Sequence, residues 1–545
     1  LFEEGVEAGN WVMLGNCHLS LKWMPDLERM VAGLAETKPH PEFRLWLTSM
    51  PSPEFPLSIL QAGIKMTTEP PSGIKANMVR GYTLVNEDVF ESHAKPAKYK
   101  KLVFALVWFH TVLLERKKFY TLGWNIMYDF NDTDFLTSAM ILDIYLNEYE
   151  HTAWAAMKYL ISEVIYGGRV TDSWDRRCMN VYVNQFFMDD TLEVPQCKLS
   201  QLPAYVIPDD GNLESYNQQI AIMPKDDNPM AFGQHANADI ASLQNTATTL
   251  LDTLSDLAPQ AVGGGGGQTR DEIMDSIARD IVTKCPPPIN LYEVKKFKSD
   301  DTNTALNIVL YQEIERYNVM VIAIAKQVKD LILGIQGLVV ITAELEQVSN
   351  DLFVGRVPGP WAKHYMSLKG LGAWTSDMML RVEFFKTWSE GPLPSVMWFG
   401  GFTFPTGFLT ALMQQHARQN GVSIDTLNWD FPIIQQREED VTQPPPSGCY
   451  MSRMSIEGAA WDHTQNVLCE PKPMELLCPM PIIYFKPQEA KKKGSKKMYG
   501  CPVYYYAIRT GSRERPSFMI TVEIACGASD PDNWVKRATA LLLST

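Results

Sequence analysis

The sequence contains few cysteines, and their number is odd. There are nine in 545 residues, spread along the chain without tight pairs. A secreted disulfide framework is denser and usually has an even count, so we expect reduced thiols in a cytosolic protein. Cys469, Cys478 and Cys501 fit no zinc-binding spacing and have no evident fourth ligand. The sequence therefore predicts no metal site.

Long hydrophobic runs and an excess of basic residues are also missing. The apolar run over residues 102–114 is too short, because a helix needs roughly 20 residues to span a bilayer. Residues 319–341 are interrupted by Lys326, Lys329 and Asp330. The formal net charge of −14 argues against bulk attraction to nucleic acid or to an acidic membrane. Neither partner is predicted.

The start of the chain is unlike that of a complete protein. Residue 1 is leucine rather than methionine, and no signal peptide is recognisable. An apolar run, residues 11–14, follows almost at once and is typical of a buried strand. We therefore expect a fragment of a longer chain.

Common catalytic motifs are absent as well. The sequence has no GxSxG, HExxH or GxGxxG pattern. Five glycines at residues 263–267 precede Gln268 and Thr269, but the lysine of a phosphate-binding loop is missing and no buried strand comes before them. The run is predicted to be a flexible linker. The acidic pairs Glu3-Glu4 and Asp226-Asp227 fall in polar stretches and are predicted to be solvated.

The strand WVMLGN ends without the residue that nucleotide hydrolysis needs. In a hydrolytic α/β module an acidic residue at a strand end holds Mg²⁺ and orients water. Here the strand ends in Gly15, Asn16 and Cys17. A neutral amide is a poor Mg²⁺ ligand and cannot act as a base. Cys17 and His18 are adjacent and are not expected to face each other, so a structural role is predicted for both.

Two other groups each have two interpretations. The tyrosines at residues 504–506 could stack on bases, but their neighbours look buried, which favours packing in a core. The basic residues Lys491, Lys492, Lys493, Lys496 and Lys497 are interrupted by glycine and serine. They are predicted to form a solvated hairpin tip, and the alternative is an electrostatic contact with an acidic partner.

Hydrophobic periodicity predicts an α+β protein with several domains. Residues 1–75 alternate strand and helix, which favours a parallel α/β layer. Residues 76–240 look mainly helical, with Asp132, Thr133 or Asp134 as candidate caps of one helix. Helices continue from residue 241 to about residue 420. The segments CPVYYYAIRT and SFMITVEIAC then predict strands in the last quarter.

Several stretches, in order along nearly the whole sequence, resemble dynein heavy chains. They are WVMLGNCHLSLKWMPDLE, FRLWLTS, LERKKFYTLGWNIMYDFNDTDF, ISEVIYGGRVTDSWDRR, FGQHANADI, VLYQEIERYN, GFTFPTGFLTALMQQHARQN and NWVKRATALLLS. Within the family, GFTFPTGFLTA and YYYAIRTGSRERPSFMITVEI are most similar to beta heavy chains of axonemal inner-arm dyneins. Two departures concern local packing: Ala236 stands where the family commonly has proline, and MSRMSIEGAAWD replaces a more aliphatic run.

The resemblance implies an architecture of four segments. Residues 1–75 would be the second half of the large α/β subdomain of the sixth AAA+ module, and residues 76–240 its helical lid. Residues 241–420 would be the helical part of the dynein C-terminal domain, and residues 421–545 an incomplete β-barrel. The resemblance places ATP and Mg²⁺ in upstream AAA+ modules. No catalytic, cofactor-binding or metal-binding residue is therefore assigned in this chain.

The resemblance also implies a function. The segment would close the AAA+ ring and transmit force in an ATP-driven, minus-end-directed microtubule motor of cilia and flagella. Expected partners are the other AAA+ modules, intermediate and light chains, and microtubules through the parent motor; the lysine run could face tubulin or a neighbouring subunit. Two alternatives remain, a structural docking module without a motor role and an active NTPase module whose missing half supplies the site.

Overall fold

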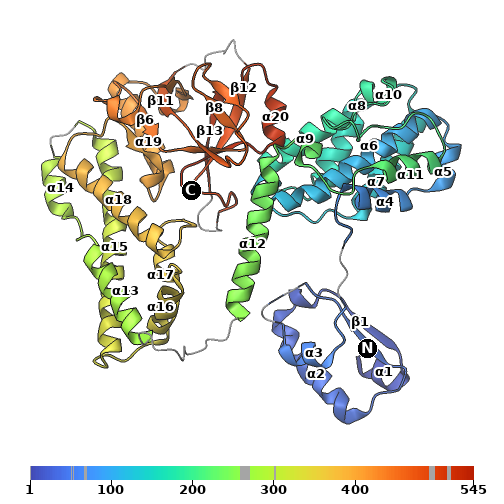
Figure 1. Ribbon diagram of the computed structural model, residues 1–545, viewed down its shortest axis with the longest axis horizontal. Helices are drawn as coiled ribbons and strands as arrows, with labels where there is room; N and C mark the ends of the chain where they lie inside the picture. Colours follow the sequence, from blue (N-terminus) through green and yellow to red (C-terminus); the bar gives the residue numbers. More distant parts are fainter. Residues whose placement is uncertain are drawn as a thin grey trace. The chain divides into compact units, whose positions relative to one another are not determined.

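The computed structural model describes residues 2–50, 52, 55–66, 70–257, 270–299, 302–489, 497–511 and 517–544. The chain divides into two compact units, Leu1–Pro71 and Ser72–Thr545 (Figure 1). The predicted linker at residues 263–267 lies outside the described residues. Each unit is described by itself.

The first unit is a small α/β layer. Its two strands, β1 (Trp11–Leu14) and β2 (Arg44–Leu47), pair in parallel. This pairing confirms the parallel layer predicted from the alternation of strands and helices. Pro25 lies in the first turn of the connecting helix, where its missing N–H costs nothing. The helices of this unit are α1 (Phe2–Ala8), α2 (Met24–Thr37) and α3 (Leu57–Ala62).

The prediction that β1 is buried was wrong. Trp11 and Met13 are each 70% exposed, whereas Leu14 packs on the small core that contains Met24 and Leu27. A continuous apolar run does not show whether both faces of a strand are covered. In this unit only one face of the two-stranded sheet packs against that core, so alternate side chains remain in solvent.

The first part of the second unit is helical. Helix α6 (Pro96–Glu115) runs through its centre, and residues from Leu102 to Phe109 are almost completely buried. The helices that surround it are α4 (Ile74–Thr83), α5 (Glu87–Ser92), α7 (Asp132–Glu148), α8 (Trp154–Tyr159), α9 (Ser173–Phe186), α10 (Asp189–Glu193) and α11 (Leu213–Ile222). Across the described part of the chain, no helix has the length and apolarity that a membrane crossing requires.

The cap of α7 lies one residue before the predicted candidates. Asn131 is the N-cap, and its side chain accepts a hydrogen bond from the backbone N–H of Asp134 at 3.2 Å. The Asp134 carboxylate in turn accepts from the Asn131 N–H at 2.9 Å. This is a capping box, in which the third helical residue satisfies the cap's own N–H. Several Asn and Asp residues in a row do not show which of them takes the cap position.

Helices continue in the middle of the second unit. Helix α12 (Asn237–Leu257) leaves the first group, and α15 (Thr304–Ile335) is the longest helix that follows (Figure 1). The others are α13 (Arg270–Lys284), α14 (Leu291–Phe297), α16 (Ala343–Val354), α17 (Gly359–Ala362), α18 (Leu371–Glu390) and α19 (Pro405–Asn420).

A buried arginine fixes α18 to the sheets. Arg381 has no exposed surface, and its Nε donates to the Asp377 carboxylate at 2.6 Å. Its Nη1 donates to the Gly400 carbonyl at 2.5 Å and to the Tyr505 hydroxyl at 3.2 Å. The guanidinium also lies 4.4 Å from the centre of the Tyr365 ring. One side chain thus ties a helix to segments far along the sequence.

The last part of the unit holds two larger sheets. One has the strand order β10-β7-β14-β12-β13 and the other β3-β6-β11-β4, with β5 also paired to β11, and β8 and β9 form a separate hairpin. The strands are β3 (Met397–Trp398), β4 (Asn428–Asp430), β5 (Ile433–Ile434), β6 (Cys449–Ser452), β7 (Ser455–Glu457), β8 (Ala460–Asp462), β9 (Val467–Cys469), β10 (Leu477–Pro479), β11 (Ile482–Gln488), β12 (Met498–Tyr504), β13 (Phe518–Ala525) and β14 (Ala540–Leu542). The sheet structure therefore begins at β3, before the predicted change at residue 420.

The hairpin interpretation of the lysine run was wrong. Strands β11 and β12 flank the run but belong to different sheets and are not paired with each other. Lys491, Lys492, Lys493 and Lys496 themselves lie outside the described residues. Strand alternation cannot show which strands pair, because pairing is decided by contacts distant in sequence.

The three tyrosines at residues 504–506 are buried, as predicted. Their exposed fractions are 1%, 3% and 9%. The Tyr505 hydroxyl donates to the Phe402 carbonyl at 2.8 Å, and the Tyr504 ring contacts Phe518 edge to face. These rings therefore serve the core, where each buried hydroxyl needs a hydrogen-bond partner.

Candidate functional site

The end of β1 holds an amide in a turn that backbone contacts fix. Asn16 has a left-handed conformation with φ of 55°, which asparagine tolerates better than most residues. Its backbone N–H donates to the Thr48 hydroxyl at 2.9 Å, and the Cys17 N–H donates to the Thr48 carbonyl at 2.9 Å. The turn at the end of β1 thus contains no carboxylate that could hold Mg²⁺.

Cys17 and His18 interact with different partners. The Cys17 thiol is buried and donates to the Leu14 carbonyl at 3.5 Å. Burial raises the pKa of this thiol, which disfavours the nucleophilic thiolate. The His18 ring nitrogen Nδ1 accepts from the Met50 N–H at 3.1 Å. The two side chains therefore do not form a nucleophile and base pair.

One of the acidic pairs predicted to be solvated is partly structural. Glu3, Glu4 and Asp226 are exposed, but the Asp227 side chain is only 6% exposed. Its carboxylate accepts from the Ile74 N–H at 2.9 Å and pairs with Lys118 at 2.8 Å. A carboxylate at the start of α4 is favoured by the helix dipole. A polar sequence neighbourhood did not reveal this contact, which spans 153 residues.

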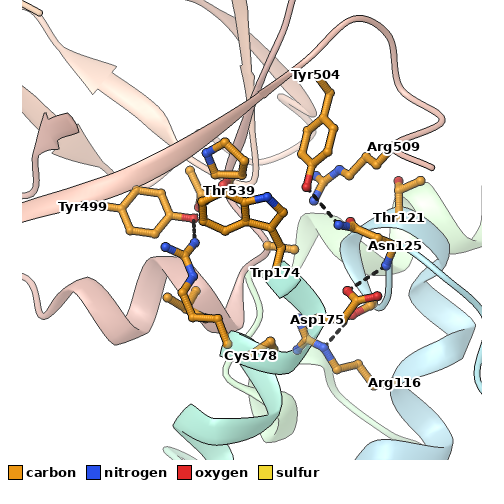
Figure 2. Close-up of a pocket in the computed structure, with 15 residues that line it drawn as sticks. Arg116, Thr121, Asn125, Trp174, Asp175, Cys178, Tyr499, Tyr504, Arg509 and Thr539 are labelled. Carbon is orange, nitrogen blue, oxygen red and sulfur yellow. Dashed lines mark hydrogen bonds between the residues drawn. The ribbon is translucent and has the colours of Figure 1, made fainter. Parts of the chain in front are cut away.

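A buried region with many polar groups lies where the helices of the second unit meet its sheets. A small cavity there is lined by residues of α9, of the segment after α6, of β12 and of the segment around α20 (Pro531–Lys536) (Figure 2). Figure 2 shows Arg116 and Asp175 on the helical side and Tyr499, Tyr504 and Thr539 on the sheet side. We call this region the junction.

Arg116 connects four polar groups of the junction. It is fully buried, and its Nε donates to the Gly123 carbonyl at 2.7 Å. Its Nη1 donates to the Tyr182 hydroxyl at 2.6 Å. Its Nη2 donates to the carbonyls of Leu122 at 3.1 Å and of Lys536 at 2.6 Å. A planar fork of donors suits such divergent acceptors, and one guanidinium thereby joins α9, α20 and the segment that follows α6.

Asp175 organises the loop that reaches the sheet. Its carboxylate accepts from the backbone N–H groups of Asn125 at 2.9 Å and Ile126 at 3.1 Å, and from the Tyr128 hydroxyl at 2.9 Å. Burial raises the pKa of Asp175 to about 6, although the backbone donors lower it. The Asn125 amide donates onward to the Tyr504 hydroxyl of β12 at 2.8 Å.

Arg177 links α9 directly to β12. Its Nη1 donates to the Gly500 carbonyl at 2.9 Å and its Nη2 to the Tyr499 hydroxyl at 3.0 Å. That hydroxyl donates to the Thr539 carbonyl at 2.7 Å. The guanidinium also lies 4.4 Å from the centre of the Trp174 ring, a cation–π distance.

The segment FGQHANADI makes a further contact with the sheet region. Asn237 donates to the carbonyls of Lys472 at 2.8 Å and Glu475 at 3.0 Å, and accepts from the Met474 N–H at 3.0 Å. Gly233 turns the backbone there with φ of 71°, a conformation that favours glycine. Ala236, the departure from the family pattern, lies immediately before α12.

These contacts have the chemistry of a rigid joint. Most polar groups of the junction bind one another, although the Nε atoms of Arg177 and Arg509 have no hydrogen-bond partner among the described residues. In the described ranges, no three or more His, Cys, Asp or Glu side chains gather into a possible metal site. Cys501 is buried next to the Thr539 carbonyl. Asp175, Arg177 and Asn237 lie in stretches that resemble the family, but no role could be predicted for them from the sequence. The available signal was the presence of charges inside apolar helical segments.

Comparison with known proteins gives the same order of parts. Residues 1–67 match a family model described as the dynein heavy chain region D6 P-loop domain. Residues 99–238 match the AAA lid domain of dynein heavy chains, and residues 244–543 match their C-terminal domain. A match to a P-loop domain model, followed by matches to an AAA lid and to a further domain, defines a segment of an AAA-type protein.

The chain belongs to the dynein heavy chain family, because the C-terminal domain model alone matches more than half of it, residues 244–543. It is 50% identical over its whole length to the dynein-1-beta heavy chain of the flagellar inner arm I1 complex of Chlamydomonas reinhardtii. It is 51% identical to the human dynein axonemal heavy chain 2, and 38% identical over 99% of its length to the rat dynein axonemal heavy chain 1. The chain spans 12% of the length of each of these relatives.

Proposed function

We propose that this chain is the ring-closing, force-transmitting C-terminal segment of an axonemal dynein heavy chain. The parent would be an ATP-driven, minus-end-directed microtubule motor of cilia and flagella. The observation that carries the proposal is a set of partly buried hydrogen bonds that fasten the first helices of the second unit to its last part. Arg116 binds α20, Arg177 binds β12, and Asn237 binds the segment before β10. Densely packed, cross-linked parts move as rigid bodies and can pass on a rotation that begins elsewhere.

We further propose the domain limits and partners given by the resemblance. The segments are residues 1–75, 76–240, 241–420 and 421–545, and the last would form an incomplete β-barrel. The two larger sheets of that region support the last point. The partners would be other AAA+ modules of the heavy chain, intermediate and light chains, and microtubules through the motor, in the cytoskeleton of the axoneme. The lysine run could contact an acidic subunit or tubulin.

The isolated chain is expected not to hydrolyse ATP. The amide of Asn16 stands where a hydrolytic module needs an acid, and the sequence holds no phosphate-binding loop. Phosphate release from the purified 545-residue chain with MgATP should equal the background without protein. Sustained turnover above that background, proportional to protein concentration and insensitive to repurification, would support the alternative of an active NTPase module.

Removal of the C-terminal domain should impair the motor. A full heavy chain that ends before Ile240 is expected to show altered microtubule gliding velocity, stall force or ATPase rate, because the rigid block across the ring is lost. The single substitution Arg177→Met removes the two direct hydrogen bonds to β12. It should alter the same motor properties, but less than the truncation does. Arg279→Met, in an exposed pair with Asp275 on α13, is the matched control. Unchanged velocity, force and ATPase in the truncated motor would favour a docking module without a motor role.

A further inference from the structure

Helix α12 projects from the body of the second unit. Its first turn is anchored by Asn237 and Ala238, and Ser242 donates to the Lys118 carbonyl at 2.8 Å. From Leu243 onward the side chains that the structure describes are exposed on every side of the helix, as far as Leu254. Figure 1 shows α12 leaving the elements around α9 and α20 with no other helix of its unit beside it.

The intrinsic preference of this segment for a helix is poor. Residues 243–254 have the sequence LQNTATTLLDTL, with four threonines, an asparagine and an aspartate. These residue types rank low in helix propensity. Even good helix formers need roughly 12–15 residues to be marginally helical alone in water. A helix in this segment therefore requires packing against something, and no described element of the second unit supplies it.

The apolar residues of α12 form a seam. Ile240, Leu243, Ala247, Leu250 and Leu254 follow one another at intervals of three, four, three and four residues. Alternation of three and four is the spacing by which one helix packs along another. Leu243, Leu250 and Leu254 are 68%, 58% and 55% exposed. The described residues of this unit therefore leave the seam uncovered from Leu243 to Leu254.

The charge of α12 restricts what can cover the seam. The helix contains Asp239, Asp252 and Asp256 and no lysine or arginine. A second copy of α12 would bring like charges together, which opposes pairing. A membrane surface is opposed too, because helices that lie on membranes carry basic residues on the polar face. The negative end of the helix dipole has no basic residue in the last turn, so a basic partner is favoured there.

We propose that α12 is one half of a helix–helix contact. Its other half is an aliphatic seam flanked by lysines and arginines in a part of the same heavy chain outside residues 1–545. This choice of partner rests on the proposed function, because it assigns the chain to a longer motor polypeptide, and the chain spans only 12% of its relatives. The contact would clamp the C-terminal domain to the rest of the motor.

Hydrogen exchange of the backbone amides of residues 243–254 tests the proposal. The experiment compares the 545-residue chain with the full heavy chain purified without accessory chains, both free of nucleotide and microtubules. Exchange should be at least about tenfold slower in the full heavy chain, because only there is the helix held closed. The readout needs no motor activity, so a failure of the proposed motor function would not affect it.

Matched variants in the full heavy chain separate the seam from helix propensity. Leu250→Ala with Leu254→Ala should abolish the protection, although alanine is the better helix former. Thr249→Ala with Thr253→Ala raises the helix propensity at positions outside the seam and should leave the protection from exchange intact. Asp252→Asn with Asp256→Asn should weaken the protection from exchange and make that protection less sensitive to salt. Fast exchange in both proteins, slow exchange in both, or protection only after accessory chains are added would each overturn the proposal.

Discussion

Replacement of Arg116 by methionine should destabilise the second unit by at least about 3 kcal/mol, since a hydrogen bond to a charged group contributes about 1.5–3 kcal/mol and this residue makes several. The carbonyls of Gly123 and Lys536 would lose their donor, because the methionine thioether cannot donate a hydrogen bond. The Leu122 carbonyl would lose Arg116 but keep the Gln234 amide. Methionine keeps most of the volume, so the loss would reflect the polar contacts rather than a large cavity.

The measurement is urea unfolding followed by tryptophan fluorescence, combined with hydrogen exchange at α20. Arg116→Met should lower the midpoint and speed exchange of α20 amides, because the bond from Arg116 to the Lys536 carbonyl is lost. Arg279→Met on α13 is the control, and its exposed pair with Asp275 should leave both values nearly unchanged. An Arg116→Met variant as stable as the unmodified protein would show that the junction does not depend on this guanidinium.

Replacement of Arg381 by leucine should cost about 3–5 kcal/mol, the range found when one partner of a buried ion pair is removed. Burial raises the pKa of Asp377, but Arg381 and Lys369 lower it, and on balance the pKa lies below its ordinary value. The carboxylate is therefore charged in the folded protein. With leucine at position 381 it would keep only Lys369, at 2.7 Å, and the Gly400 carbonyl would lose its donor.

Two further variants make the Arg381 prediction specific. Arg381→Lys restores the charge but not the planar fork, and should recover only part of the stability. The guanidinium groups of Arg381 and Arg453 each lie 5.2 Å from the centre of the Trp398 ring. The Arg453 side chain, however, is half exposed and pairs with Glu438. Arg453→Leu should therefore shift the urea midpoint only slightly. If Arg381→Leu and Arg453→Leu had equal effects, burial of the ion pair would not be the source of the stability.

Much of the local structure could be predicted from residue patterns. The parallel pairing of β1 with β2 followed from two apolar runs separated by a helical segment, and the burial of the tyrosines at residues 504–506 from their apolar neighbours. The predictions that were wrong concern what covers an element. Trp11 is exposed because no described helix of its own unit covers that face of the sheet. Strand β11 does not pair with β12 because each pairs with other strands. Hydrophobic periodicity predicts neither which face of a strand is covered nor which strands pair.

The sequence by itself determined the family, the order of the parts and the amide at the end of the first strand. These are properties of residue identity and local spacing, and they need no contact between distant segments. Only the tertiary structure decided that Arg116 meets the Lys536 carbonyl across 420 residues and that Asp227 caps α4. It also decided that, among the described residues of the second unit, nothing covers α12 from Leu243 to Leu254. Such contacts depend on how packed elements bring distant segments together, and local residue preferences do not encode which segments meet.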